Sequence, residues 1–159
     1  DQTMPNIQDV LGDPQPVTYV PFRNMILLSL ALAQAEVIDC RHIFIGLQVH
    51  DQYGYWDTTP HFLNAMNNVS SQNRAHPIQI HAPFIDCSKS DEIRICQTLN
   101  QLDLLQHTLT CYDPDHNGAS CGRCPSCSER IHNFAQCGLI DPINYQISIP
   151  WDQLLNTQV

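Results

Sequence analysis

The chain has 159 residues, 43% of them apolar and 14% charged, so it can bury enough surface to fold and lacks the composition of a disordered protein. Seven Lys and Arg against sixteen Asp and Glu give a formal charge of -9, the wrong sign for a protein that neutralises phosphates. We therefore expect one globular protein that does not bind nucleic acid directly.

Membrane and secreted classes are also disfavoured. No apolar run approaches the roughly 20 residues that span a bilayer; the longest is residues 25–33, which Ser29 interrupts. Residues 1–13 are polar and acidic and do not resemble a signal peptide. Four of the eight cysteines are crowded into one run, which suits a metal better than disulfides. These features predict a cytoplasmic protein in a reducing compartment.

The N-terminal region predicts a lead-in followed by a helix. Residues 1–18 contain three prolines, one glycine and few periodic apolar residues, which predicts an extended segment. In residues 22–37, apolar side chains fall at helical spacing, and Leu28 and Leu32 extend them around the circumference. We expect a helix that is buried on most sides, with Pro21 suited to its first turn.

The central region alternates strands and helices. Residues 42–49 are a short apolar run before the turn-forming residues 51–54, and they predict a central strand. A second helix is expected to begin at Thr59 or Pro60. Residues 78–84 predict a second strand, and residues 88–99 a third helix with Ser88 as its N-cap.

This alternation predicts an α/β fold with a parallel sheet. Only two strands are recognisable, fewer than a stable open sheet usually has, so the sheet should lack its other half. The expected organisation is an extended lead-in over residues 1–18, a partial α/β domain over 19–110, a zinc-binding segment over 111–142 and a C-terminal tail over 143–159.

Four cysteines form the motif C-x9-C-x2-C-x2-C: Cys111, Cys121, Cys124 and Cys127. Two-residue gaps let successive thiolates bind the same ion, and the longer nine-residue gap lets Cys111 reach that ion as the fourth ligand. Four protein ligands leave no open position, so a structural zinc is expected. An iron–sulfur cluster also uses four thiolates, but its usual spacings differ. Free buried cysteines or a disulfide pair are the simpler alternative.

Other histidines and cysteines are interpreted as having no metal role. The flanking histidines are expected to be bystanders, and the remaining cysteines small core residues. They are His107, His116 and His132, and Cys40, Cys87, Cys96 and Cys137.

Residues 51–57 form a second candidate site, directly after a predicted strand. In an open α/β sheet, ligands bind outside the carboxyl ends of the strands. Asp51 and Asp57, with three aromatic residues between them, therefore suggest a pocket for a flat polar molecule. A carboxylate can accept hydrogen bonds from a purine-like amidine edge while an aromatic ring stacks on its face. A polar turn with packed aromatic side chains is the alternative.

Arg23 and Asn24 open the first predicted helix. An arginine near a helix N-terminus can clamp a phosphate or a carboxylate, or it can be a solvated helix end.

In this order, the features resemble one family, the 7-cyano-7-deazaguanine synthases of queuosine biosynthesis (QueC). That family carries V-P-x-R-N at a helix start, G-Y-x-D after the next strand, T-x-x-C-Y, and C-G-x-C-x-x-C followed by Arg. Here these are residues 20–24, 54–57, 108–112 and 121–127, with Arg130 following. Lys89, Phe134 and the pair Asp141 and Pro142 also match, so the resemblance runs from about residue 19 to residue 142.

The resemblance implies a partial adenine-nucleotide α-hydrolase-like (Rossmann-like) fold with a C-terminal zinc knot held by four cysteines. It implies an ATP- and Mg²⁺-dependent C–N ligase that turns 7-carboxy-7-deazaguanine and ammonia into 7-cyano-7-deazaguanine (preQ0). The carboxylate would be adenylated, converted to the amide and activated again to give the nitrile. It further implies that Arg23 and Asn24 face the ATP phosphates or the substrate carboxylate, that Tyr55 and Asp57 lie near the deazapurine, and that Lys89 is a further phosphate contact.

The sequence departs from the family at its phosphate loop, S-G-G-x-D-S, because it contains no Gly-Gly dipeptide. The chain therefore resembles roughly the C-terminal two-thirds of such an enzyme. We expect no independent nucleotide turnover, and either a homo-oligomer or completion by an N-terminal half. Smaller departures, which bear on substrate contacts, are Phe22 for Gly, Trp56 for Pro, and Thr58 with Thr59 for Cys-Arg.

Two other functions stay open. One is a non-catalytic zinc-binding partner module derived from that fold. The other is a related ATP-pyrophosphatase that acts on a different carboxylate or on tRNA, although the acidic charge argues against tRNA.

Overall fold

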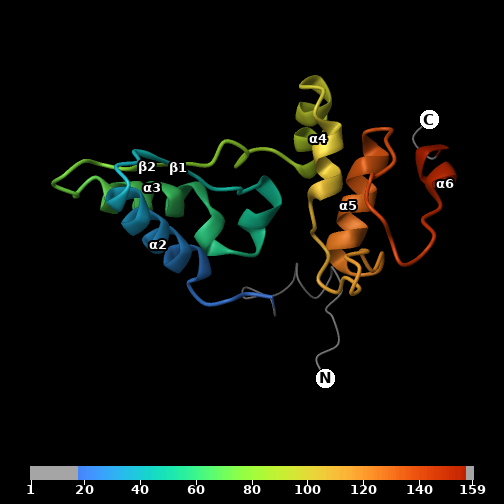
Figure 1. Ribbon diagram of the computed structural model, residues 1–159, viewed down its shortest axis with the longest axis horizontal. Coiled ribbons are helices and arrows are strands. Elements are labelled where there is room, and N and C mark those ends of the chain that lie inside the picture. Colours follow the sequence, from blue (N-terminus) through green and yellow to red (C-terminus); the bar gives the residue numbers. More distant parts are fainter. Residues whose placement is uncertain (1–17, 157–159) are drawn as a thin grey trace. The chain divides into compact units, whose positions relative to one another are not determined.

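The computed structural model describes residues 18–156 and divides into two compact units (Figure 1). Their division falls between Ser88 and Lys89, whereas the sequence suggested a domain boundary after residue 110. We call residues 18–88 the sheet unit and residues 89–156 the cysteine unit. The expected lead-in lies, except for Thr18, outside the described residues.

The sheet unit alternates helices and strands as predicted. Its elements in chain order are α2 (Arg23–Val37), β1 (His42–Phe44), the 3-10 helices η1 (Val49–Tyr53) and η2 (Trp56–Thr58), α3 (Pro60–Ser70) and β2 (Gln79–His81). Strands β1 and β2 are hydrogen-bonded side by side and parallel, with Ile43 opposite Ile80. The parallel pairing predicted from the alternation is therefore confirmed.

Helix α3 is fixed at both ends by side chains. The Thr59 hydroxyl caps its N-terminus by accepting the Phe62 N–H at 3.2 Å, and Pro60 occupies the first turn. At the other end, the Ser70 hydroxyl accepts the Ile78 N–H at 3.1 Å. The side chain of Asn67 bonds both the N–H and the C=O of Ile80, at 2.8 and 3.0 Å. These bonds attach α3 to β2.

The core of the sheet unit is small. Buried side chains from α2, α3 and β2 form it: Leu28, Phe62, Met66 and Ile80. Phe62 and Met66 are four residues apart, so they share the face of α3 that packs on the strand.

The prediction that the first helix is buried on most sides is wrong. Helix α2 forms where expected, but only Asn24, Leu28 and Ala35 are buried in it. The side chains of Ile26, Leu27 and Leu30 are 53%, 55% and 65% exposed. The two described strands are too narrow to cover more than one stripe of a helix, so the other apolar positions meet solvent.

Both strands are shorter than predicted. Residues 42–49 were expected to form one strand, but β1 ends at Phe44 and the chain enters η1 at Val49. The Ile45 N–H still donates to the His81 C=O at 2.9 Å. Two residues further along the neighbouring strand lies Pro83, which has no N–H to donate. The ladder therefore ends, because its next donor is missing.

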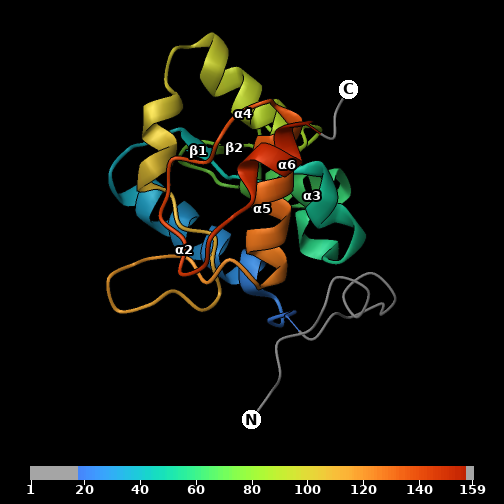
Figure 2. The same cartoon turned by 90° about the vertical axis from the view of Figure 1, so that its right-hand side faces the viewer.

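The cysteine unit is built mainly of helices. They are α4 (Lys89–Thr98), the 3-10 helix η3 (Leu102–His107), α5 (Pro125–Gln136) and α6 (Trp151–Asn156). Helix α5 packs against α4 and α6, and Figure 2 shows α6 lying beside it. Buried residues of α4 and α5 include Ile93, Ile131 and Phe134.

The segment after residue 142, expected to be a tail, folds onto the cysteine loop. Ser120 and Tyr145 form an isolated parallel bridge, in which the Ser120 N–H donates to Asn144 and the Gln146 N–H donates to Ser120, each at 2.9 Å. Gly122 has φ +71°, and a Cβ built there would lie 2.6 Å from Cγ1 of Ile147. A glycine is therefore required for this close approach.

The prediction that the four scattered cysteines are core residues is also wrong. Cys40, Cys87, Cys96 and Cys137 are all only partly buried. Cys40 follows the end of α2, and Cys137 is the C-cap of α5. Apolar neighbours in sequence do not bury a residue that lies at the end of a helix.

None of the helices within residues 18–156 combines the length and apolar character needed to cross a lipid bilayer.

Candidate functional site

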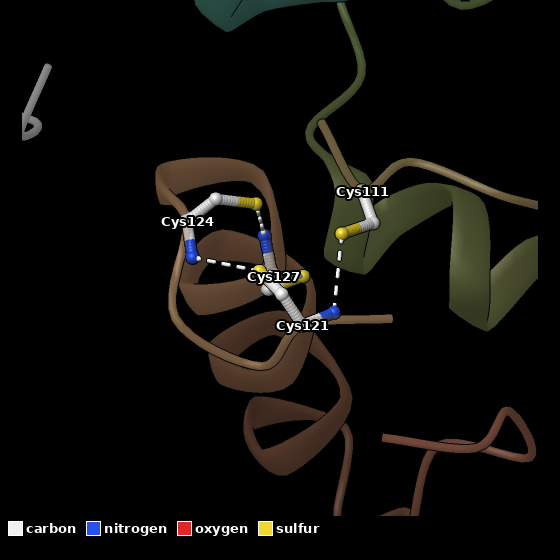
Figure 3. Close-up of side chains that lie close together, drawn as sticks. All are labelled: Cys111, Cys121, Cys124 and Cys127. Carbon is white, nitrogen blue, oxygen red and sulfur yellow. Dashed lines mark hydrogen bonds between the residues drawn. The ribbon is translucent and has the colours of Figure 1, made fainter. Parts of the chain in front are cut away.

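The four cysteines of the motif come together in the cysteine unit (Figure 3). The Sγ atoms of Cys111, Cys121, Cys124 and Cys127 all lie within 4.8 Å of one another. Cys124 caps the N-terminus of α5, and Cys127 lies in its first turn. The two-residue gaps therefore place three thiols on one turn of loop and helix, and the longer loop returns to Cys111.

Backbone N–H groups point at these sulfurs. The Cys111 Sγ accepts hydrogen bonds from the N–H of Asp113 and of Cys121, at 3.3 and 3.2 Å. The Cys121 Sγ accepts from Arg123 and Cys124, at 3.4 and 3.3 Å. The Cys127 N–H donates to the Cys124 Sγ at 3.4 Å. Such donors stabilise negative charge on sulfur, as a metal-bound thiolate requires.

The donor set and spacing fit a zinc ion. Tetrahedral zinc with Zn–S bonds of about 2.3 Å separates its sulfurs by ~3.8 Å. The Sγ atoms of Cys121 and Cys127 are 3.9 Å apart. A disulfide would need ~2 Å between sulfurs, and all four thiols are free. Four thiolate ligands would leave no coordination position for a substrate, so a bound zinc would be structural.

The thiols differ in acidity. Burial by itself raises the pKa of Cys121, but the N–H groups of Arg123 and Cys124 and the neighbouring thiols outweigh it and lower the pKa to about 7. Cys127 is fully buried, and this desolvation raises its pKa. A cation among these sulfurs would favour the thiolate form of all four.

The three flanking histidines do not join the cluster. Among the residues that the structure describes, the group able to hold a metal contains only the four cysteines. His107, His116 and His132 are exposed, and the His132 Nε2 lies 2.9 Å from Gln136 Nε2. Their expected role as bystanders of the cluster stays a prediction.

A buried ion pair that the sequence analysis did not predict lies next to the cysteines. The Arg130 guanidinium bonds the Asp141 carboxylate through Nε and Nη2, at 2.6 and 2.9 Å. It also donates to the Thr108 hydroxyl at 2.7 Å and to the Leu105 C=O at 3.0 Å. Arg130 therefore ties α5 to η3 and to the segment after α5. In the sequence, Arg130 and Asp141 stood out only as positions that match the family resemblance, and nothing indicated that they pair with each other.

Tyr145 completes this network. Its hydroxyl donates to the Asp141 carboxylate at 2.7 Å. Burial raises the pKa of this phenol, and the hydrogen bond to Asp141 adds to the shift. The phenol therefore remains a hydrogen-bond donor, and it stabilises the charge of Asp141 inside the protein.

In the sheet unit, two predicted site residues form a local clamp. Asp57 is 2% exposed, and its carboxylate accepts the backbone N–H of Asn24 at 3.0 Å. The Asn24 side-chain amide donates to the Asp57 C=O at 3.1 Å. Helix α2 has no side-chain cap of its own, and its N-cap residue Phe22 has φ 56°. Asp57 therefore supplies the carboxylate that the helix N-terminus favours.

Arg23 and Tyr55 lie beside this clamp. The Arg23 guanidinium lies over the Tyr55 ring, 6.0 Å from its centroid, and the Arg23 side chain is exposed. Tyr55 stacks on Tyr19, with ring centroids 6.5 Å apart. The Trp56 indole donates to the Tyr19 hydroxyl at 2.7 Å. These contacts gather Arg23, Asn24, Tyr55 and Asp57 around the start of α2, and their roles toward a ligand stay predictions.

The other two predicted residues have different surroundings. The Asp51 carboxylate accepts the Gln48 N–H at 3.3 Å in a capping box that starts η1. Lys89 belongs to the cysteine unit, where its ammonium group forms an ion pair with Glu129. Their roles toward a ligand stay predictions.

Comparison with known proteins identifies relatives over most of the chain. The sequence profile of the family described as Queuosine biosynthesis protein QueC matches residues 1–138. A protein of Azoarcus sp. (strain BH72) named 7-cyano-7-deazaguanine synthase is 46% identical over 136 residues, which cover 82% of this chain and 59% of the relative. A protein of the same name from Geobacter sp. (strain M21) is 43% identical over 141 residues, which cover 86% of this chain and 62% of the relative. The chain thus spans about 60% of the length of these curated relatives.

Proposed function

Because the chain belongs to the queuosine biosynthesis family QueC, we propose that it forms the zinc-bearing part of an ATP-dependent 7-cyano-7-deazaguanine synthase. Such an enzyme would use ATP and Mg²⁺ to combine 7-carboxy-7-deazaguanine with ammonia. The observation that carries the proposal is the set of relatives with this name, 46% and 43% identical over most of the chain.

The overall conversion removes two molecules of water from a carboxylic acid and ammonia and involves no change of oxidation state. A carboxylate oxygen would attack the α-phosphorus of ATP and expel pyrophosphate, and ammonia would then displace AMP to give the amide. The amide oxygen would attack a second ATP, again with loss of pyrophosphate, and leave as AMP while the nitrogen loses its protons to give the nitrile. This route needs cationic groups that hold phosphate and carboxylate, and a site that orients the flat base.

The start of α2 offers a suitable cation. Arg23 is exposed, while Asn24 beside it is anchored by Asp57. The guanidinium therefore projects from a fixed helix end, where the helix dipole also favours an anion. We assign Arg23 to the ATP phosphates or the substrate carboxylate, with Asp57 as the residue that positions the helix end. Lys89 is proposed as a further phosphate contact.

The four cysteines would hold a structural zinc. The metal supplies a cross-link between Cys111, the loop of Cys121 and Cys124, and the first turn of α5 through Cys127. Residues 108–110 directly precede Cys111, so the cross-link would also fix their position.

A second candidate function is a non-catalytic zinc module. It is favoured by Thr58 and Thr59, which stand where the resemblance expects Cys-Arg. Thr58 is buried and donates to the Tyr55 C=O at 2.6 Å, and Thr59 caps α3. Both side chains therefore have purely structural contacts.

The two functions are separated by a reconstitution assay. The zinc-loaded chain is incubated with ATP, Mg²⁺, ammonium and 7-carboxy-7-deazaguanine, alone and together with the portion of the Azoarcus relative that it does not match. Mass spectrometry then detects the nitrile. Formation of the nitrile in either mixture supports the proposal that the chain is part of a synthase. If neither mixture forms the nitrile although the chain is folded and holds one zinc, the synthase proposal is contradicted and the zinc module is supported.

A further inference from the structure

The two edges of the small sheet differ. The outer edge of β2, which faces away from β1, is covered by side chains of α3. Asn67 bonds both the N–H and the C=O of Ile80, at 2.8 and 3.0 Å. The Ser70 hydroxyl accepts the N–H of Ile78 and donates to its C=O. The backbone groups on this edge are therefore already paired, and another strand could bond there only by displacing α3.

The outer edge of β1 is open within residues 18–156. The Ile45 N–H donates to the His81 C=O of β2 at 2.9 Å. Neighbouring residues of a strand point their backbone groups to opposite sides, so those of His42 and Phe44 point away from β2. Among the described residues, the hydrogen bond made to these groups comes from the Cys40 thiol to the His42 C=O, at 3.2 Å. Such an edge is a template for a further strand.

Helix α2 has an apolar flank on the side away from α3. A hollow between the two helices is lined by Leu32 and Glu36 of α2, which mark the flank that faces α3. Successive residues turn by about 100° around a helix, so Leu27 and Ile38 lie on the other side of the buried Leu28. Leu27 and Ile38 are 55% and 61% exposed. Two large apolar side chains therefore share an uncovered flank.

The layering of the sheet unit places this flank over the open edge. Helix α2 packs on β1 and α3 packs on β2. Both helices cover the face of the sheet that carries Ile43 and Ile80 (Figure 1). The flank of α2 that faces away from α3 therefore lies above the space beyond the outer edge of β1. A strand in that space would pair with β1 and bury the apolar flank in one step.

Chain connectivity points to the occupant. Helix α3 connects the parallel strands β1 and β2, and α2 leads into β1 within the same layer of helices. Connections between parallel strands are almost always right-handed, so a strand that precedes α2 in a longer protein would lie beyond β1 and not beyond β2. The curated relatives are longer, because the matched regions cover only 59% and 62% of them.

We propose that the open edge of β1 and the apolar flank of α2 form a docking surface for a parallel strand from the portion of the relatives that this chain does not match. The backbone of this strand bonds His42 and Phe44, and the apolar side chains on one of its faces cover Leu27 and Ile38. Main-chain bonds give such strand addition its affinity, and alternate side chains give it specificity. The inference rests on the proposed function, because it takes the partner from the synthase relatives.

Amide hydrogen exchange tests the edge residue by residue. The 159-residue chain is coexpressed with the unmatched portion of the Azoarcus relative and purified as a complex. In the chain alone, the amides of His42 and Phe44 should exchange fast, whereas those of Ile43 and Ile45, which bond β2, should exchange slowly. In the complex, the amides of His42 and Phe44 should exchange at least about tenfold more slowly. The amide of Ile80, which is already bonded to α3, should slow less.

Three variants test the surface. Leu27→Ser removes an apolar contact from the flank and should raise the dissociation rate of the complex at least about tenfold. Val37→Ser is the matched control: Val37 is 81% exposed and lies nine residues from Leu28, on the side of α2 away from the sheet, so the rate should not change. Phe44→Pro removes an outward N–H, leaves the bonds to β2 intact and should prevent the complex. Melting curves of the chain alone show whether each variant is folded.

Three results overturn the inference. They are the absence of a complex, slow exchange of His42 and Phe44 in the chain alone or in a dimer of the chain, and a complex in which these two amides still exchange fast. If Phe44→Pro does not fold, the exchange pattern and Leu27→Ser decide the matter.

The proposed function is judged separately by the nitrile assay. A complex with a protected β1 edge that forms no nitrile would contradict the synthase and leave the docking surface standing. Nitrile formation in a mixture where His42 and Phe44 still exchange fast would refute the docking surface and leave the synthase standing.

Discussion

The guanidinium of Arg130 and the carboxylate of Asp141 face each other through two parallel hydrogen bonds, of 2.6 and 2.9 Å, in the interior of the cysteine unit. The two residues are 6% and 4% exposed. Every charged atom of the pair has a protein partner, because Thr108, Leu105 and Tyr145 supply the remaining bonds. The pair therefore stabilises the fold only as a complete network.

Replacing one member of the ion pair should break this hydrogen-bond network and destabilise the cysteine unit. We expect Asp141→Ala to cost about 3–5 kcal/mol, because it leaves a buried guanidinium unpaired. Hydrogen exchange of the amides of α5 and of residues 141–146 measures the loss. The exposed pair of Arg94 and Asp91, 3.3 Å apart, is the matched control, and Arg94→Ala should cost less than ~1 kcal/mol. Equal protection in both variants would show that the buried pair is not structural.

Zinc removal should loosen the cysteine unit and spare the sheet unit. One zinc per chain is expected by elemental analysis, and a chelator should speed amide exchange between residues 111 and 145. Cys121→Ser should lose the metal, whereas Cys96→Ser, which alters a thiol outside the cluster, should retain it. A chelated chain with unchanged exchange would contradict a structural metal.

Asp57→Ala should destabilise the N-terminal turn of α2. The substitution leaves the buried Asn24 N–H without its acceptor, at a cost of about 1–3 kcal/mol. Asp57→Asn keeps an acceptor oxygen and should cost less. Amide exchange of the first turn of α2 reports the difference, and Asp103→Ala, an exposed carboxylate, is the control. If α2 exchanges alike in all three variants, Asp57 does not cap it.

Arg23→Ala should impair the reaction without changing stability. Its side chain is exposed, so little folding energy is at stake, but loss of a charged hydrogen bond to an anion lowers kcat/KM by about 10- to 100-fold. The reconstituted nitrile assay measures this effect. Arg74→Ala, at another exposed arginine of the sheet unit, should be neutral. Unchanged turnover in Arg23→Ala would remove Arg23 from the site.

Two glycines allow a matched test of the cysteine loop. Gly118 and Gly122 have φ +83° and +71°, but a Cβ would meet open space at Gly118 and the Ile147 side chain at Gly122. Gly118→Ala should therefore cost only the backbone strain, about 1 kcal/mol. Gly122→Ala should cost more, because residue 147 must also move. Thermal unfolding measures the stability of both variants, and equal losses of stability would show that the Ile147 side chain moves aside at no cost.

Local chemistry was readable from the sequence. The C-x2-C-x2-C spacing predicted the thiol cluster, because two-residue gaps return successive side chains to one point within a single turn. The start of α3 was also predicted, because it too depends on residues close together in the sequence: the Thr59 hydroxyl accepts an N–H only three residues away. The parallel pairing of β1 and β2 followed from the helix between them.

Long-range partners were decided only by the tertiary structure. The role of Asp57 toward a ligand stays a prediction, but its contact with the backbone N–H of Asn24, 33 residues earlier, could not be predicted from the sequence. The apolar positions of α2 predicted burial, yet only the side facing the described strands is covered. The pairing of Arg130 with Asp141 likewise depends on how the segment after α5 folds back. A sequence specifies which groups must be satisfied, but the partner that satisfies each one depends on which segments pack together.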